Sequence, residues 1–324
     1  MRLLKHSGLV LAALLMLAGA AAPGRSQDFP AKPIRLIVPF APGGGLDIQA
    51  RLLSQKMFET WKQPVVVDFR AGAAGNIGAE LAAKSPADGY TLLLSVSNLL
   101  INPLIYSDTR YDARKDFAPL SLTATAPQIL VAHASVPAKS IEDLLALART
   151  SKLTYATTGI GSVGHLSAEL FSNAAGIRMI NVPYKGSGAA VTDLLGGHVQ
   201  MMFSAPGAMI QHIKSGRLRA LAITSAKRAG EGLEDVPTFI ESGYPSVEVY
   251  NWFGMFAPAG TPAPLVSKLN REIVRIIGLP DVKERITASG YTPVSSTPAE
   301  FVAFIAAESA KWEKIVKASG VRAN

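Results

Sequence analysis

The sequence predicts a two-lobed α/β fold for two reasons. Short β-branched runs alternate with amphipathic stretches, and the chain is longer than chains that fold around a single hydrophobic core usually are. The alternation starts at Ile34 and continues in two series along the 324 residues. This order is expected where helices cover both faces of a mostly parallel sheet. About 300 residues usually divide their hydrophobic core, so two lobes are expected. No cysteine is present, and stability must therefore come from burial rather than from disulfides.

The first series of elements predicts one lobe. Residues 34–38 have the composition of a buried strand, and the loop 39–45 follows them. Apolar residues then recur at helical spacing toward Trp61, at Ile48, Leu52, Leu53 and Met57. The same order of strand and helix is predicted for the segments 65–68, 77–83 and 91–95.

The second series predicts another lobe and then a helical C-terminal region. Its candidate strands are residues 129–132, 154–157, 179–182, 199–203 and 221–224. Helices are predicted to begin between them, near Ile141, Gly164, Gly188 and Ala208. A last strand at 249–256 precedes two helices, 264–277 and 298–317, and the prolines Pro264 and Pro298 suit helix starts.

The strand count indicates that the C-terminal region returns to the first lobe. Too few strands precede Ala124 to form a sheet of ordinary size. We therefore expect one lobe from residues 27–124 together with 250–324, and a second lobe from residues 125–249. Two crossovers result, near 120–128 and 246–252, and such a pair is typical of a hinge with a ligand cleft between the lobes.

The N-terminus has the pattern of a secretory signal peptide. Arg2, Lys5 and His6 form a basic start, residues 8–20 are almost wholly apolar, and three alanines lead into a polar stretch. The apolar core is shorter than the roughly 20 residues that a membrane-spanning helix needs. We predict cleavage after Ser26, so that residues 1–26 are removed, and release of the chain into the periplasm without a lipid anchor.

Charge and composition exclude several functional classes. Removal of Arg2, Lys5 and Arg25 with the signal peptide leaves 29 basic against 24 acidic residues, a net charge of +5 in place of +8. Those charges are scattered, which argues against nucleic-acid binding, while a mild basic excess suits anionic ligands. Without cysteines, and without paired histidine spacing, no metal or other cofactor is expected.

A glycine-rich loop follows the first predicted strand. Residues 39–45 read Pro-Phe-Ala-Pro-Gly-Gly-Gly and lead directly into a helix, with Asp47 as its expected cap. Glycines allow close backbone approach, and the unpaired amides and dipole at a helix start favour an anion. The Gly-Lys-Ser/Thr sequence of a phosphate-binding P-loop is absent here.

A second glycine-rich loop, residues 157–165, lies in the same setting in the other lobe. Its three glycines match the dinucleotide fingerprint, but the acidic residue required about 20 positions later is missing. Ser162 and His165 invite a serine-hydrolase interpretation, yet Ile160 stands at the first glycine of the nucleophile elbow. A capping hydroxyl and a polar ligand-facing histidine are the favoured interpretation, with an exported hydrolase as the alternative.

Other strand ends supply hydroxyls and amides to the same expected cleft. Ligands of open α/β sheets bind at the carboxyl ends of strands, and here these ends carry few cations apart from Lys185. Neutral donors can hold a carboxylate without an arginine. The predicted ligand-binding residues, none of them catalytic, are Phe40, Ala41, Gly43, Gly44, Asp47, Ser97, Asn98, Thr157, Gly161, Ser162, His165, Tyr184, Gly186 and Ser204.

Several motifs occur together in a specific order across nearly all of the chain. They are the loop 39–45 within residues 29–51, then 72–78, 88–90, 102–103, 161–165, 182–188, 193–197, 215–221 and 252–262. In this order the chain resembles the Bug-type receptors of tripartite tricarboxylate transporters, which are periplasmic binding proteins of type II, the Venus-flytrap class.

The resemblance implies a receptor rather than an enzyme, and we expect the receptor to be a monomer. It implies a small carboxylate bridged between the lobes, and delivery to the membrane subunits of the transporter. Two departures from the family pattern matter: Leu46 stands where Thr or Ser is usual, and Ser204 where Asp is common. Loss of that acid disfavours a ligand ammonium group, so a non-amino carboxylic acid is expected. A sensor that signals to a membrane kinase is a further alternative.

Overall fold

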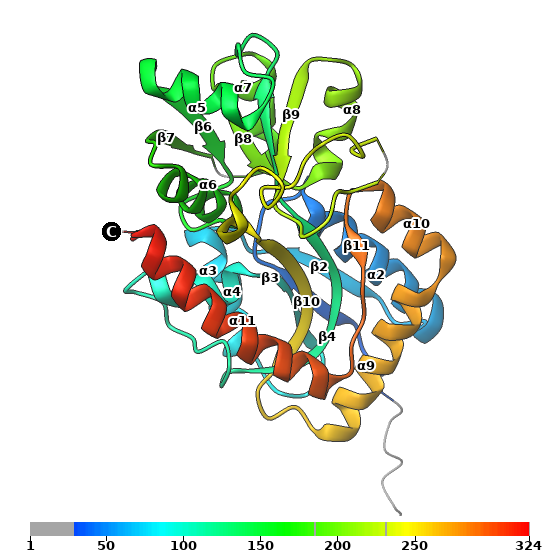
Figure 1. The fold of residues 1–324 in the computed structure, drawn as a ribbon. Helices are drawn as coiled ribbons and strands as arrows, with labels where there is room; N and C mark the ends of the chain where they lie inside the picture. The colour runs from blue at the N-terminus through cyan, green and yellow to red at the C-terminus, as the bar shows by residue number, and fades with distance from the viewer. Residues whose placement is uncertain (1–28, 185, 231, 324) are drawn as a thin grey trace, which may run out of the picture.

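The computed structural model describes residues 29–184, 186–230 and 232–323. The predicted signal peptide and Lys185 lie outside the described residues. Two sheets flanked by helices form two lobes, one above the other in Figure 1. The two-lobed α/β fold predicted from the sequence is therefore confirmed. None of the helices in the described ranges combines the length and the apolar character needed to cross a membrane.

The larger sheet has six strands in the order β11-β4-β10-β3-β1-β2. Its strands are β1 (Ile34–Val38), β2 (Val65–Phe69), β3 (Thr91–Val96), β4 (Phe117–Pro127), β10 (Tyr250–Pro258) and β11 (Thr292–Pro293). β1 is parallel to β2 and β3, whereas β10 runs antiparallel to both β3 and β4. The helices of this lobe are α2 (Gly45–Trp61), α3 (Asn76–Ala83), α4 (Asn98–Ile105), α9 (Ala263–Gly278), α10 (Pro280–Ala288) and α11 (Pro298–Ser319), with the 3-10 turn η1 (Ala73–Gly75).

The smaller sheet has five strands in the order β7-β6-β8-β5-β9. Its strands are β5 (Ile129–His133), β6 (Leu153–Thr157), β7 (Met179–Pro183), β8 (Met201–Ser204) and β9 (Leu218–Ile223). β6 is parallel to β7 and β8, and β5 runs antiparallel to β8 and β9. The helices are α5 (Ile141–Thr150), α6 (Val163–Ala175), α7 (Ser187–Leu195) and α8 (Ile210–Lys214), with the turns η2 (Pro206–Ala208) and η3 (Pro245–Val247).

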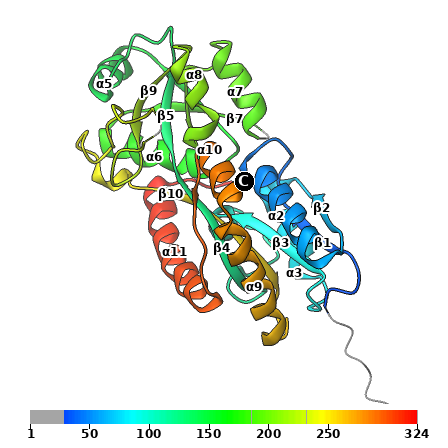
Figure 2. The same ribbon diagram turned by 90° about the vertical axis from the view of Figure 1, so that its right-hand side faces the viewer.

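The chain crosses between the sheets at two adjacent places. β4 ends at Pro127 and β5 begins at Ile129, so Gln128 alone makes the first crossing, and Figure 2 shows β4 leading into β5. Residues 120–127, expected as part of a crossover, are instead strand, because β10 and β11 pair with them. The lobe boundaries placed at 124/125 and 249/250 remain predictions.

One buried threonine joins both crossings. The Thr224 hydroxyl accepts a hydrogen bond from the Gln128 N–H (2.8 Å) and donates one to the Val249 carbonyl (2.5 Å). The backbone of Thr224 also donates to the Gln128 carbonyl (2.8 Å) and accepts from the Val249 N–H (3.2 Å). The two crossing segments are therefore held side by side at the end of β9.

Helix α11 packs along the larger sheet and reaches the other lobe. A capping box between Thr297 and Glu300 begins the helix. Its buried Phe301 ring lies directly over Gly254 of β10, where any Cβ atom would overlap the ring. At its far end, the Ala318 carbonyl accepts a hydrogen bond from the Asn173 side chain of α6 (3.0 Å). Figure 1 shows α11 crossing the front of the sheet toward α6.

We expect Phe301→Ala to destabilise the protein by about 3–5 kcal/mol, because a fully buried ring leaves a cavity over Gly254. Urea unfolding followed by circular dichroism measures the loss. Phe58→Ala is the matched control, since that ring on α2 is 48% exposed and should change stability by no more than about 0.5 kcal/mol. Equal effects of the two substitutions would contradict the packing of α11.

Candidate functional site

The first glycine loop presents backbone donors at the start of α2. Gly44 is the N-cap of the helix, with no side chain bonded to the cap. No acceptor in the described part of the chain pairs with the N–H groups of Gly44, Gly45 and Leu46. Gly43 has φ +100°, which favours glycine, whereas Gly44 has φ −107°, which any residue can adopt. The loop therefore ends in unpaired donors at the positive end of a 17-residue helix.

Asp47 does not cap α2 in the way that the sequence predicts. It lies in the first turn of the helix, and its carboxylate accepts a hydrogen bond from the Gly43 N–H (3.0 Å). The same carboxylate pairs with Arg51 (2.6 Å) one turn later. Asp47 therefore fixes the shape of the loop. Leu46 is buried and belongs to the hydrophobic core of the larger lobe.

The second glycine loop is organised around a buried histidine. The Ser162 hydroxyl accepts from the His165 N–H (3.3 Å) and so caps α6, as predicted. The His165 Nδ1 accepts from the Gly161 N–H (3.1 Å), while its Nε2 lies 3.8 Å from a Glu169 oxygen. That oxygen also accepts from the Tyr155 hydroxyl (2.6 Å). Burial lowers the pKa of His165 to about 4, so the ring is neutral at neutral pH.

These contacts bear on the hydrolase alternative. A catalytic histidine must accept the proton of the serine hydroxyl through a free ring nitrogen. Here Nδ1 is already bonded to Gly161 and Nε2 faces Glu169. No hydrogen bond joins the Ser162 hydroxyl to the imidazole within the described ranges. The pair is arranged to hold a loop rather than to activate a nucleophile.

The second glycine loop rests on α4 of the other lobe. The Asn98 side chain donates to the Gly161 carbonyl (3.4 Å), and the Tyr106 hydroxyl donates to the Ile160 carbonyl (3.3 Å). A Cβ atom on Gly161 would come within 2.9 Å of Ile105. Gly161 thus allows the loop to approach the helix closely. Asn98, predicted as a site residue, therefore makes one of the two polar contacts that join α4 to this loop.

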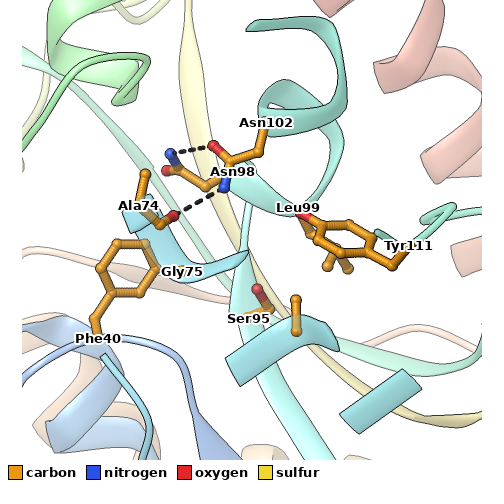
Figure 3. A pocket seen from close by; sticks show the side chains of 9 residues that line it. Phe40, Ala74, Gly75, Ser95, Asn98, Leu99, Asn102 and Tyr111 are labelled. Atoms are coloured by element: carbon orange, nitrogen blue, oxygen red, sulfur yellow. Dashed lines mark hydrogen bonds between the residues drawn. The ribbon is translucent and has the colours of Figure 1, made fainter. Parts of the chain in front are cut away.

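A network of asparagines extends from Asn98 into the larger lobe. The Asn98 amide donates to Asn102 (3.3 Å), and Asn102 donates to the Ala74 carbonyl (2.9 Å) and to Asn76 (2.8 Å). Figure 3 shows the first two of these bonds beside Phe40 and Gly75. Phe40, Gly75 and Asn98 line a small pocket there that has no room for a water molecule. The predicted Phe40 therefore lies on the same surface as Asn98.

The loop before α3 has an unusual backbone that the sequence does not reveal. Gly72, Ala73, Ala74 and Gly75 all have positive φ, and for the two alanines, at +45° and +53°, this conformation is strained. The Asn102 bond to Ala74 helps to hold it. Asn76 and Asn102 appeared in the sequence only as motif residues, with no pattern that identifies them as partners. Strain of this kind is commonly retained near functional sites.

The remaining predicted site residues lie at strand ends, mostly with partners inside the protein. Ser97 accepts from the Trp252 N–H (3.2 Å), and Thr157 donates to Asn181 (2.9 Å). The Tyr184 hydroxyl donates to Asp193 (2.7 Å), and burial with this carboxylate raises the pKa of Tyr184 to about 12. Ser204 is buried at the end of β8, Gly186 is the N-cap of α7, and Ala41 is exposed in the first loop.

The arrangement suits an anion held by neutral donors. Unpaired N–H groups begin α2, and the same is true of Val163 and Gly164 at the start of α6 in the described chain. Two helix dipoles and several amides favour a negative charge without a cationic side chain. Across the described residues, no three His, Asp or Glu side chains come close enough to hold a metal ion.

Comparisons with known proteins identify the family that the chain resembles. Residues 49–321 match the sequence pattern of a family described as "tripartite tricarboxylate transporter family receptor". The chain is 41% identical over 317 residues to the protein BugT of Bordetella pertussis, which covers 97% of each chain.

Solved structures show the same fold. A protein of R. palustris solved with adipate is 36% identical, with a TM-score of 0.86 over 91% of this chain and 99% of that one. The periplasmic binding protein BugD is 34% identical, with a TM-score of 0.84 over 91% and 99%. MatC from Rhodopseudomonas palustris, with bound malate, is 30% identical, with a TM-score of 0.81 over 89% and 100%. The predicted periplasmic-binding-protein fold is thereby confirmed.

We expect stability to fall between pH 6.5 and 4 in a way that depends on His165. The folded-state pKa lies below the usual 6.5 because of burial, so the unfolded chain binds more protons in this window. The contribution is complete above pH 6.5 and is lost as pH falls toward 4, by roughly 3 kcal/mol. The free energy of unfolding, measured with urea at pH 7 and at pH 4.5, should therefore fall less in His165→Gln than in the wild type. His133→Gln, at a partly exposed position, is the control and should behave as the wild type does. An equal loss of unfolding free energy between the two pH values in all three proteins would show that His165 is not the group responsible.

Proposed function

The chain belongs to the tripartite tricarboxylate transporter receptor family, and we propose that it captures a small carboxylate between its lobes and delivers it to the membrane subunits of such a transporter. This is a family of solute-binding receptors, not of enzymes. The single observation that supports the proposal most strongly is the set of unpaired amides at the starts of α2 and α6, which come from different lobes. Two of the similar structures hold carboxylates, adipate and malate.

The ligand in this proposal is a carboxylic acid without an ammonium group. An ammonium needs an acceptor carboxylate, and Ser204 stands at the strand end where the resemblance would place one. The carboxylate of Asp47 is already bonded to Gly43 and Arg51. The ligand-binding residues that we assign are those predicted from the sequence. Asp47, His165 and Ser162 act in this assignment by shaping the two loops that hold the anion.

The proposal also includes export. The N-terminal pattern of residues 1–26 is that of a cleaved signal peptide, and BugD among the similar structures is described as periplasmic. In the periplasm the receptor would act as a monomer, since one chain supplies both glycine loops.

N-terminal sequencing of the protein from a periplasmic extract should give a chain that begins at Gln27. The basic start, the short apolar core and the small residues before Ser26 direct processing there. A protein that still carries Met1 and sediments with the membranes would contradict the export proposal.

Gly44→Val should abolish carboxylate binding and leave the fold intact. A Cβ atom on Gly44 meets no protein atom within 4 Å, and φ −107° suits valine, so the side chain would intrude only on the ligand. Thermal-shift assays with malate, adipate, citrate and benzoate measure binding. An acid that binds the wild type should stabilise that protein by about 2.7 kcal/mol when its concentration is a hundredfold over its Kd. The variant should gain no shift.

The matched control is Gly278→Val, at the end of α9, where a Cβ atom also meets no protein atom within 4 Å. This variant should respond to the acids as the wild type does. If Gly44→Val keeps the wild-type shift, the first glycine loop does not bind the ligand. If no acid shifts the wild type, carboxylate capture itself is wrong.

A further inference from the structure

Tyr291 lies over the first glycine loop although it comes from the far end of the chain. It follows α10 in the turn before β11, and its ring packs edge-on against Phe253 with centroids 5.0 Å apart. Its phenolic oxygen occupies the place of a side chain on Gly45, where any Cβ atom would overlap it. Side chains of a helix tilt toward its N-terminus. The hydroxyl is therefore beside the unpaired amides that begin α2.

The hydroxyl of Tyr291 differs from those of three other tyrosines that are buried or partly buried. Tyr111, Tyr155 and Tyr184 donate to Asn76, Glu169 and Asp193 respectively. For Tyr291, no hydrogen-bond partner occurs in residues 29–184, 186–230 or 232–323. Burial raises its pKa to about 12, so it keeps its proton at neutral pH and can donate. Tyr291 is partly buried, but its hydroxyl oxygen retains accessible surface, so another molecule can reach it and accept its hydrogen bond.

The other lobe fixes the position of this turn. Gly290, with φ +77°, lies against Gly207 of η2 so closely that a Cβ atom on either glycine would overlap the backbone of the opposite segment. Gly207 belongs to the smaller lobe, and the turn 289–291 belongs to the larger one. Contact between the lobes therefore holds Tyr291 over Gly45. In Figure 1, α10 reaches up to the smaller lobe on the side away from α11.

We propose that Tyr291 is a ligand-binding residue that helps to determine specificity, with its hydroxyl donating to the carboxylate held at the start of α2. The inference rests on the proposed function and goes beyond it, because the sequence did not predict this residue as part of the site. The amides of α2 and the phenol supply donors from two segments to one anion. The fixed ring also limits the space beside that carboxylate, so acids with a bulky group next to it are disfavoured.

Tyr291→Phe tests the role of the hydroxyl, since the ring and its contact with Phe253 are retained. Isothermal titration with malate, adipate, citrate and benzoate gives Kd for each acid that binds the wild type. We expect Kd to rise about ten- to a hundredfold, the usual effect of losing a hydrogen bond to a charged group. The melting temperature of the ligand-free protein should stay that of the wild type, because that state loses no protein–protein hydrogen bond.

Tyr90→Phe is the matched control. It also removes one phenolic oxygen, which in the wild type accepts a hydrogen bond from the Ala31 N–H (2.9 Å). Tyr90 lies just before the start of β3, away from the glycine loops. Its Kd should equal that of the wild type. A Tyr291→Phe protein that binds within twofold of the wild type would overturn the role of Tyr291 and leave the receptor function standing. A wild type that binds none of the four acids would instead overturn the proposed function on which this inference rests.

Discussion

The hydrogen bonds of Thr224 are the constraint on which the two-lobed arrangement depends. This one residue is bonded to Gln128 in the first crossing and to Val249 in the second. The two crossings lie together at the end of β9, and a pair of adjacent crossings is the usual form of a hinge between lobes.

The proposed recognition of an anion by backbone amides would explain why few charged side chains surround the candidate site. Buried cations are costly to desolvate, whereas helix-start amides are already unpaired and fixed in direction. The side chains near the loops have supporting tasks. Asp47 bonds to Gly43, His165 bonds to Gly161, and Asn98 joins the second loop to α4. The neutral state of His165 fits this structural task, since a protonated ring would lose Nδ1 as an acceptor.

Glycines allow close contact at two places where the lobes meet. Gly161 lies against the Ile105 side chain, and Gly207 lies against the backbone of Gly290, so that neither place has space for a further side chain. Both contacts join a loop near the candidate site to the other lobe. The strained alanines at 73 and 74 are tied to Asn102, which also bonds to Asn98. A change in the angle between the lobes would therefore shift the hydrogen bonds of both the second glycine loop and the loop before α3.

The sequence by itself predicted most of the strands and helices and the two glycine loops, because local apolar spacing and glycine clusters encode these features, but it missed α4 and β11. It placed β1 at its observed bounds, yet it treated most of β4 as a crossover, since pairing with β10 is not a local property. Only the tertiary structure decided that His165 turns toward Gly161 and Glu169, that Ala73 and Ala74 take positive φ, and that Tyr291 covers Gly45. Some of these contacts join residues that are distant in the sequence, and the others depend on which side chains are buried. The spacing of residues along the chain encodes neither sequence-distant contacts nor burial.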